Sequence, residues 1–386
     1  MPNRLLSLCH TRVLAGLLLV FLMLCGTGLQ AAPPAYGVNA MWGPGDALTL
    51  TERFRKAKSL GVTRVRLDWE WRWVEGVRGQ YRWAMLDTLV KTAHQEGIEL
   101  LPIIHYAPSW ALAPGEQPSD LYEMAPDEAA FADYARFVKA SIRRYGPGGT
   151  AKFPFTPIVH WQIWNEPNLK QFWGPTPNAG SYAKLMRHVQ QATASLRSQV
   201  KLVHAGLSKS DLLFFWQLWE VDPNYGNTFD IMAVHPYVYD WRDGIREPEA
   251  MDADEVQLSP LGIVGSLNDP GYLGKVFNLQ VLMRLKGAPK PIWITEMGYF
   301  ISDQHHLGVS EYGAAERMYQ TLNYIQNRLT DLPYGTGLRD FPADVQRVYW
   351  FALEDYPSPD GIGTFGFYRE DGSERPATSV FRHFTR

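Results

Sequence analysis

The 386-residue chain contains little cysteine, and all of it lies near the N-terminus. Its two cysteines, Cys9 and Cys25, both fall within the first 32 residues. If that segment is removed, no thiol remains, and disulfides are excluded as a source of stability. The fold then depends on its apolar core, for which a hydrophobic content of 46% is ample.

The chain also lacks any long basic run, and its formal net charge is only -3. Proteins that bind nucleic acids usually present a clustered positive surface. We therefore expect no nucleic-acid partner.

The N-terminal segment has the order of a secretory signal. Arg4 and Arg12 flank an apolar run over residues 13–24, and the small pair Ala31-Ala32 follows. The run is shorter than the ~20 apolar residues of a membrane span. We expect residues 1–32 to be a signal peptide, or an N-terminal anchor and the sole membrane contact if it is not cleaved. Residues 33–386 are then one exported domain, periplasmic or extracellular.

No glycine-rich phosphate loop follows any predicted strand, and no repeat is evident. Apolar strand-like runs instead alternate with segments of helical period, in about eight units, which is typical of a parallel α/β barrel, the (β/α)8 or TIM barrel. A doubly wound open sheet is the alternative, and the missing phosphate loop weakens it. Strands are predicted over 36–42, 63–69, 99–106, 158–164, 201–206, 230–237, 291–297 and 347–353.

In such a barrel the active site is built at the carboxyl ends of the strands. Two apolar runs end there in a carboxylate: Glu166, followed by the strand-breaking Pro167, and Glu296. An acid at the end of an apolar strand is costly unless it is used. A pair of such carboxyl groups, one acting as acid and one as nucleophile, is the smallest set of side chains that cleaves a glycosidic bond.

Other strands also carry polar residues at or near their ends. Arg66 alternates with apolar neighbours and should point inward, where it either orients a catalytic carboxylate by paired hydrogen bonds or forms a structural ion pair. His105 closes the third strand, and a single histidine at a strand end is as often structural as functional. Tyr237 is placed to donate its hydroxyl to the nucleophile, and Trp350 offers a floor for a sugar ring.

Taken in order, these residues resemble those of clan A glycoside hydrolases, which carry Arg, His, Asn-Glu, His-x-Tyr, Glu and Trp along one barrel. The motifs at 164–168 and 294–298 are most similar to family 39, including its bacterial exopolysaccharide glycosidases, and family 5 is a near relative. Many family 39 members add a β-sandwich domain that this chain does not show. The matching residues are Arg66, His105, Asn165-Glu166, His235-Pro236-Tyr237, Glu296 and Trp350.

The resemblance implies that Glu166 is the general acid/base and Glu296 the nucleophile of a retaining enzyme that needs no metal or cofactor. The two carboxylates should then lie about 5–5.5 Å apart. It also implies that Asn165 binds the sugar 2-hydroxyl. The expected substrate-binding residues are Arg66, His105, Trp110, Asn165, Trp173, His235, Tyr237 and Trp350.

The aromatic content points to a carbohydrate substrate, although core packing accounts for many rings. The chain has 14 Trp, 19 Tyr and 18 Phe, and several aromatic residues near strand ends favour endo-action. The resemblance to family 39 implies a bacterial exopolysaccharide as substrate, and we expect β-linkages and a monomeric enzyme. An exo-acting, β-xylosidase-like or cellulase-like hydrolase is the alternative, as is a non-catalytic carbohydrate-binding scaffold. The aromatic residues in question are Trp42, Trp69, Trp71, Trp73, Trp110, Trp173, Tyr239 and Trp241.

Overall fold

A computed structural model describes residues 32–43, 49–117, 123–237, 273–305, 308–329, 343–357 and 363–386. The part from Pro33 to Arg386 forms one compact unit. Residues 1–31 of the predicted signal segment and the predicted loop over 239–268 lie outside the described residues. In the described part of the chain, no helix combines the length and apolar character needed to cross a bilayer.

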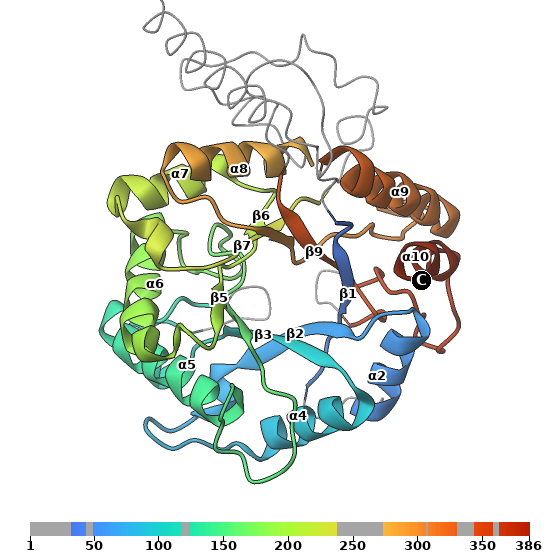
Figure 1. Cartoon of the computed structure of the whole chain (residues 1–386). Helices are drawn as coiled ribbons and strands as arrows, with labels where there is room; N and C mark the ends of the chain where they lie inside the picture. Colours follow the sequence, from blue (N-terminus) through green and yellow to red (C-terminus); the bar gives the residue numbers. More distant parts are fainter. Residues whose placement is uncertain are drawn as a thin grey trace, which may run out of the picture. The chain divides into compact units, whose positions relative to one another are not determined.

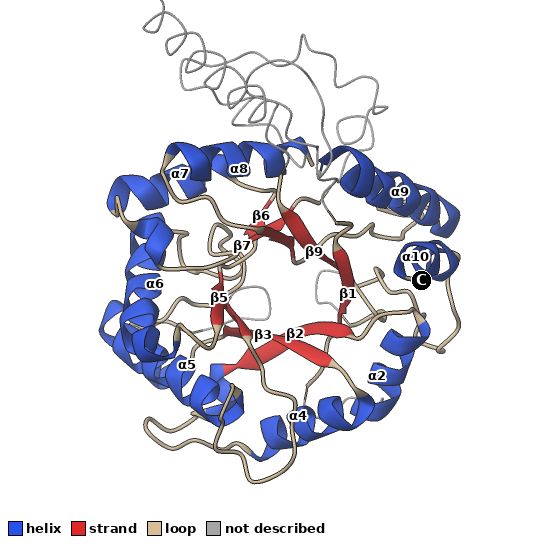
Figure 2. Cartoon of the chain, in the orientation of Figure 1, coloured by secondary structure: helices blue, strands red, loops and turns tan. Residues whose placement is uncertain are grey.

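The strands form one parallel sheet that curls into a ring, with the helices around its outside (Figures 1 and 2). Neighbouring strands follow the order β5-β4-β3-β2-β1-β9-β8-β7-β6. The predicted TIM barrel is therefore confirmed. The strands are β1 (Ala35–Asn39), β2 (Arg64–Glu70), β3 (Glu99–His105), β4 (His160–Ile163), β5 (Lys201–Val203), β6 (Leu207–Ser208), β7 (Met232–His235), β8 (Ile292–Ile294) and β9 (Val345–Trp350).

The ring closes at β5 and β6, which are two pieces of one barrel strand. β5 pairs with β4, whereas β6 pairs with β7. A single bridge from Val203 to Ile231 joins the two sides. The sequence predicts one strand over 201–206, and the structure interrupts it at residues 204–206.

Several helices begin or end at local sequence signals. Thr49 and Glu52 form a reciprocal capping box at the first long helix, and Gly97, with a left-handed φ of 69°, ends another. The helices are α2 (Leu50–Ser59), α3 (Trp71–Val74), α4 (Ala84–Glu96), α5 (Phe131–Tyr145), α6 (Ala179–Thr193), α7 (Leu212–Val221), α8 (Gly274–Leu285), α9 (Glu311–Tyr324) and α10 (Ala377–Thr385).

Strand alternation separates the barrel interior from the layer beneath the helices. On β2, Val65, Leu67 and Trp69 join the main apolar core, as predicted for the outward face. Arg64 and Arg66 lie on the opposite face. Arg64 pairs with Glu99 near the strand starts, so the charged face of β2 is used at both ends of the barrel.

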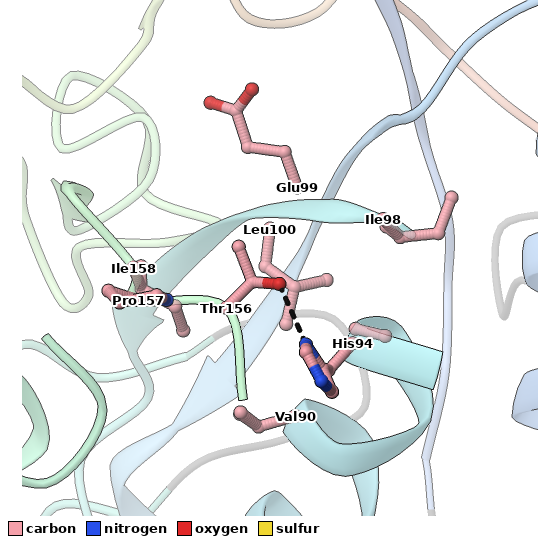
Figure 3. Close-up of a pocket in the computed structure, with 9 residues that line it drawn as sticks. Val90, His94, Ile98, Glu99, Leu100, Thr156, Pro157 and Ile158 are labelled. Atoms are coloured by element: carbon pink, nitrogen blue, oxygen red, sulfur yellow. Dashed lines mark hydrogen bonds between the residues drawn. The ribbon is translucent and has the colours of Figure 1, made fainter. Parts of the chain in front are cut away.

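The amino-terminal end of the barrel is packed with side chains. Leu101, Ala233, Trp293 and Tyr349 belong to a separate buried cluster there. A cavity of about 10 Å³ lies outside this cluster, beside the start of β3, with His94 and Thr156 hydrogen-bonded across 3.0 Å (Figure 3). It is far from the strand carboxyl ends, so the chemistry must be sought at the other end of the barrel.

Candidate active site

Glu166 and Glu296 meet at the carboxyl ends of the strands, as the sequence predicts. Glu166 follows β4 by three residues, and Glu296 follows β8 by two. One oxygen of each carboxylate and one ring nitrogen of His235 all lie within 4.8 Å of one another. Glu166 is 6% exposed and Glu296 is 9% exposed. The distance between these carboxylate oxygens, at most 4.8 Å, is close to the ~5–5.5 Å between the carboxyl groups of retaining glycosidases and well short of the ~6.5–9.5 Å of inverting ones.

The backbone that carries Glu166 is held in an unusual conformation. Trp164 has a φ of 71° and Glu166 a φ of 39°, in the left-handed region that non-glycine residues seldom occupy. The Glu166 amide donates to the Gly206 carbonyl at 3.1 Å. Strained residues of this kind cost about 1–3 kcal/mol each and persist where the surrounding structure imposes them. The strain lies at the residue that the sequence predicts to be catalytic.

Arg66 is the central donor of the site and is only 1% exposed. Its Nη1 donates to Glu296 Oε1 at 2.6 Å and to Asn39 Oδ1 at 2.7 Å. Its Nη2 donates to Asn165 Oδ1 at 2.8 Å, and its Nε donates to Gln162 Oε1 at 2.7 Å. The contact with the carboxylate is thus a single hydrogen bond instead of the predicted pair. Because a guanidinium only donates, the atom of Asn165 that faces Arg66 is its oxygen, and the amide nitrogen points away from the guanidinium.

Burial raises the pKa of Glu296, but the electrostatic influence of His235 and Arg66 and the hydrogen bonds from Arg66 and Tyr237 outweigh it. The net pKa is therefore below the usual range, and the carboxylate is ionised at neutral pH. Tyr237 Oη donates to Glu296 Oε2 at 3.0 Å, the contact expected from the sequence.

Burial also raises the pKa of Glu166, and here the opposing influence of His235 does not compensate for it. The negative charge of Glu296 acts in the same direction as burial. Glu166 is thus biased towards its protonated form. Its bonded neighbour is His235, whose Nδ1 lies 2.7 Å from Glu166 Oε1. Two carboxylates with pKa values displaced in opposite directions are suited to act as an acid and a nucleophile.

Gly206 allows His235 to approach the strand break. A Cβ atom on Gly206 would lie 1.9 Å from His235 Nε2, far closer than two non-bonded heavy atoms can approach. The same residue supplies the carbonyl that holds the Glu166 amide.

Three site residues were not anticipated from the sequence: Asn39, Gln162 and Thr295. All three are buried, and they join the strands that carry the predicted residues. Asn39 Nδ2 donates to the Thr295 carbonyl at 3.0 Å, and Gln162 Nε2 donates to Thr295 Oγ1 at 3.3 Å. The available signal was strand alternation, which places Gln162 on the same inward face of β4 as His160.

The structure contradicts the placement predicted for Trp350. Its side chain is 3% exposed and packs against Tyr299 and Phe381, so it points outward to the helices. The next residue, Phe351, faces the site instead: its ring lies 6.3 Å from that of Tyr237, and its amide donates to the Met297 carbonyl. The prediction was displaced by one position, which reverses the face of a strand.

The two other predicted aromatic contacts also lie against protein. Trp173 is 2% exposed and packs edge-on against Trp164 and Tyr182, behind β4. Trp110 is partly buried against Trp71 and donates to the Glu75 carbonyl. Neither ring joins the two carboxylates in the described structure, and their roles in sugar binding stay predictions.

His105 lies beside the site within an acidic group. Its Nε2 is 2.9 Å from Asp68 Oδ1. Nearby, Glu70 is bonded to Arg72 at 2.5 Å, and Arg72 also reaches Glu123 at 2.8 Å. Burial, reinforced by the charge of Asp68, raises the pKa of Glu70 to about 8 despite its ion pair with Arg72.

Glu166, His235 and Glu296 are also the group in the described chain with metal-binding geometry. Two of its ligand atoms are already joined, because His235 Nδ1 is hydrogen-bonded to Glu166. Arg66 supplies a positive charge 2.6 Å from Glu296. These contacts fit a pair of reacting carboxylates better than a metal centre.

The chain is similar to known proteins in its structure, whereas comparison of its sequence found no match. No family model matches the chain, and no curated protein matches it. A family 39 glycoside hydrolase from Bacteroides cellulosilyticus superposes with a TM-score of 0.63 at 19% identity, over 92% of this chain and 63% of that one. The chain therefore spans less than two thirds of that relative's length.

Two further solved structures lie in neighbouring families. A family 5, subfamily 18 protein from Bifidobacterium longum, crystallised with Manβ1-4GlcNAc, has a TM-score of 0.59 at 14% identity and covers 91% of this chain and 78% of its own. A family 30, subfamily 8 xylanase from Clostridium acetobutylicum has a TM-score of 0.52 at 18% identity, over 92% and 72%. The chain has the fold of the clan A glycoside hydrolases, in agreement with the resemblance of its motifs.

Proposed function

We propose that the protein is a retaining glycoside hydrolase, with Glu296 as nucleophile and Glu166 as general acid/base. The observation that carries the proposal is the pairing of these carboxylates within 4.8 Å, with pKa values displaced in opposite directions. The fold supports it, because clan A enzymes place such pairs at the same end of the barrel.

In the first step, Glu296 attacks the anomeric carbon while Glu166 transfers its proton to the departing glycosidic oxygen. The C–O bond to the leaving group breaks as the bond to Glu296 forms. Arg66 and Tyr237 hold Glu296 ionised and aimed before the attack. The amide nitrogen of Asn165 is positioned to donate to the sugar 2-hydroxyl.

In the second step, Glu166 is a carboxylate and removes a proton from water. The water oxygen attacks the anomeric carbon and displaces Glu296, which returns both residues to their starting states. Because the anomeric carbon is inverted twice, the product keeps the configuration of the substrate.

We further propose that the substrate is a β-linked poly- or oligosaccharide, cut internally, and that the enzyme acts outside the cytoplasm. The disaccharide seen in the family 5 relative and the xylanase among the structural neighbours support β-linked glycans. The signal-like N-terminal sequence supports export. A panel of bacterial exopolysaccharides, with product sizes followed over time, tests both the substrate and the endo mode: short oligomers from the start indicate endo-action, and single sugars indicate exo-action.

Glu296→Gln should remove turnover by several orders of magnitude without changing the melting temperature by more than a few degrees. Glu166→Ala should lose activity on poor leaving groups and recover it with azide or an activated aryl glycoside. Glu128→Gln, at a glutamate on the outside of the barrel that pairs with Lys184, is the matched control. A Glu296→Gln variant within tenfold of wild type, or a product of inverted configuration, would contradict the proposal.

A further inference from the structure

Two uncharged, fully buried residues, Gln162 and Thr295, connect Arg66 to His235. Gln162 accepts from Arg66 Nε at 2.7 Å and donates to Thr295 Oγ1 at 3.3 Å. Thr295 Oγ1 lies 3.0 Å from His235 Nε2, and His235 Nδ1 lies 2.7 Å from Glu166 Oε1. The catalytic machinery proposed above assigns no task to Gln162 or Thr295.

The direction of the first hydrogen bonds is fixed by chemistry. A guanidinium has only donors, so the atom of Gln162 that faces Arg66 must be its oxygen. The NH2 group of Gln162 therefore faces the other way, where it donates to the His204 carbonyl at 3.1 Å and to Thr295 Oγ1.

Thr295 then has one hydrogen left to donate. Among the described residues, the contacts of its Oγ1 are Gln162, which is a donor, and His235 Nε2. If Nε2 carried a hydrogen, the Thr295 hydroxyl would accept twice and its own hydrogen would be left without an acceptor. An unpaired buried polar group is costly enough to disfavour that tautomer about 5- to 150-fold in population. The same cost applies to a doubly protonated His235.

We propose that Thr295, oriented by Gln162, holds His235 as the neutral tautomer protonated on Nδ1, and thereby directs the catalytic proton of Glu166 to Oε2. Thr295 and Gln162 are positioning residues, because they act on Glu166 through His235. The catalytic part of this inference rests on the proposed hydrolase function.

The reaction follows from this arrangement. His235 Nδ1–H occupies Glu166 Oε1, so the acid proton resides on Oε2 and moves from there to the glycosidic oxygen as the C–O bond breaks. In the second step, Oε2 takes a proton from water. The Nδ1–H group keeps its hydrogen throughout and stabilises the Glu166 carboxylate between the two steps.

Both carboxylates near His235 lie on its Nδ1 side, which favours a hydrogen on that nitrogen. The Nδ1 side faces Glu166 at 2.7 Å and Glu296 at 3.7 Å, so one N–H dipole is directed at both carboxylates. With the ring neutral, Glu296 is stabilised as a carboxylate by Arg66, by Tyr237 and by the Nδ1–H dipole, without a full charge on His235. On the Nε2 side lies Thr295. The rings of His235 and Tyr237 are roughly perpendicular, with their centres 6.5 Å apart.

Nitrogen-15 NMR of the full chain, labelled at its ten histidines, tests the tautomer without any substrate. The His235 signals are identified by their loss in His235→Asn. We expect wild type to show a protonated Nδ1 and an unprotonated Nε2 near neutral pH. Thr295→Ser should keep this pattern, whereas the isosteric Thr295→Val should show a population protonated on Nε2. A wild-type His235 protonated on Nε2, or an unchanged pattern in Thr295→Val, would overturn the inference, and the wild-type spectrum decides even if the valine variant does not fold.

Kinetics test the consequence for catalysis. Thr295→Val should lower kcat/KM at least tenfold for substrates whose leaving group must be protonated, and much less for a dinitrophenyl glycoside. It should also move the basic limb of the pH profile, and Thr295→Ser should restore both. Equal losses on both substrates would overturn the positioning role. Absence of any glycosidase activity in wild type would refute the proposed function, and the NMR result would still decide the tautomer.

Discussion

Arg66 Nη1 lies 2.6 Å from Glu296 Oε1, although the two residues are 230 positions apart in the sequence. The guanidinium is almost fully buried and donates to four residues on three other strands or their ends, β1, β4 and β8. It therefore combines two functions: it compensates the charge of the nucleophile, and it ties together the carboxyl end of the barrel.

Replacing Arg66 should impair both functions. Arg66→Met leaves the buried carboxylate without its compensating charge, so we expect kcat/KM to fall at least about a thousandfold and stability to fall by about 3–5 kcal/mol. The pKa of Glu296 should rise, which moves the acidic limb of the kcat/KM profile to higher pH. Arg66→Lys keeps the charge and should retain more of the limb position. Arg64→Met, on the same face of β2 but paired with Glu99 at the opposite end, is the control. An unshifted acidic limb in Arg66→Met would argue against charge compensation.

Tyr237→Phe removes one hydrogen bond from the nucleophile. A hydrogen bond to a charged group contributes about 1.5–3 kcal/mol, so we expect kcat to fall about 10- to 100-fold, with the acidic limb moved upward. Tyr299→Phe removes a buried hydroxyl bonded to Thr321 instead and should leave the pH profile unchanged. If both variants alter the profile equally, the effect belongs to packing and not to Glu296.

Because the Phe351 ring faces the site and the Trp350 ring faces the helices, substitutions at these two positions should have opposite effects. Phe351→Ala should raise KM or lower kcat/KM for the substrate, because this ring lies beside Tyr237 at the site. Trp350→Phe should lower the melting temperature, by the equivalent of about 1–2 kcal/mol, with little change in KM, since its ring is core. Thermal melts and Michaelis–Menten kinetics on the same preparations distinguish the two. The reverse outcome would mean that Trp350 is the residue that contacts sugar.

Glu70 should make stability depend on pH. Because burial raises its folded pKa to about 8, the folded state binds a proton that the unfolded state releases near its ordinary pKa of about 4.3. Stability is therefore lost as pH rises between these values, by up to a few kcal/mol above pH 8. Glu70→Gln mimics the protonated form, so its melting temperature relative to wild type should rise from pH 5 to pH 9. Asp68→Asn should reduce this trend, because the Asp68 charge contributes to the shift. A difference that falls with pH would contradict the assignment.

The sequence predicts the reacting pair because each glutamate interrupts an apolar strand at its end, which is a local and strong signal. It does not predict Gln162 and Thr295, because a single polar residue inside a short strand has no local signature and acquires its role only when four strands meet. At the end of β9 the residues on both faces are aromatic, so composition cannot decide which ring points inward, and Phe351 was overlooked. Trp173 resembles a surface tryptophan in its polar loop, yet the ring packs back onto Trp164.

Gly206 has only hydrogen atoms to place against the His235 ring, because any side chain there would occupy the position of Nε2. A residue larger than glycine at position 206 is therefore incompatible with histidine at position 235. A lineage that gained a side chain at 206 would have to give up the imidazole as well, and with it the support of the acid. We expect distant relatives that keep the histidine to keep the glycine, and relatives with a larger residue at this position to lack the histidine, which a broad alignment would show directly.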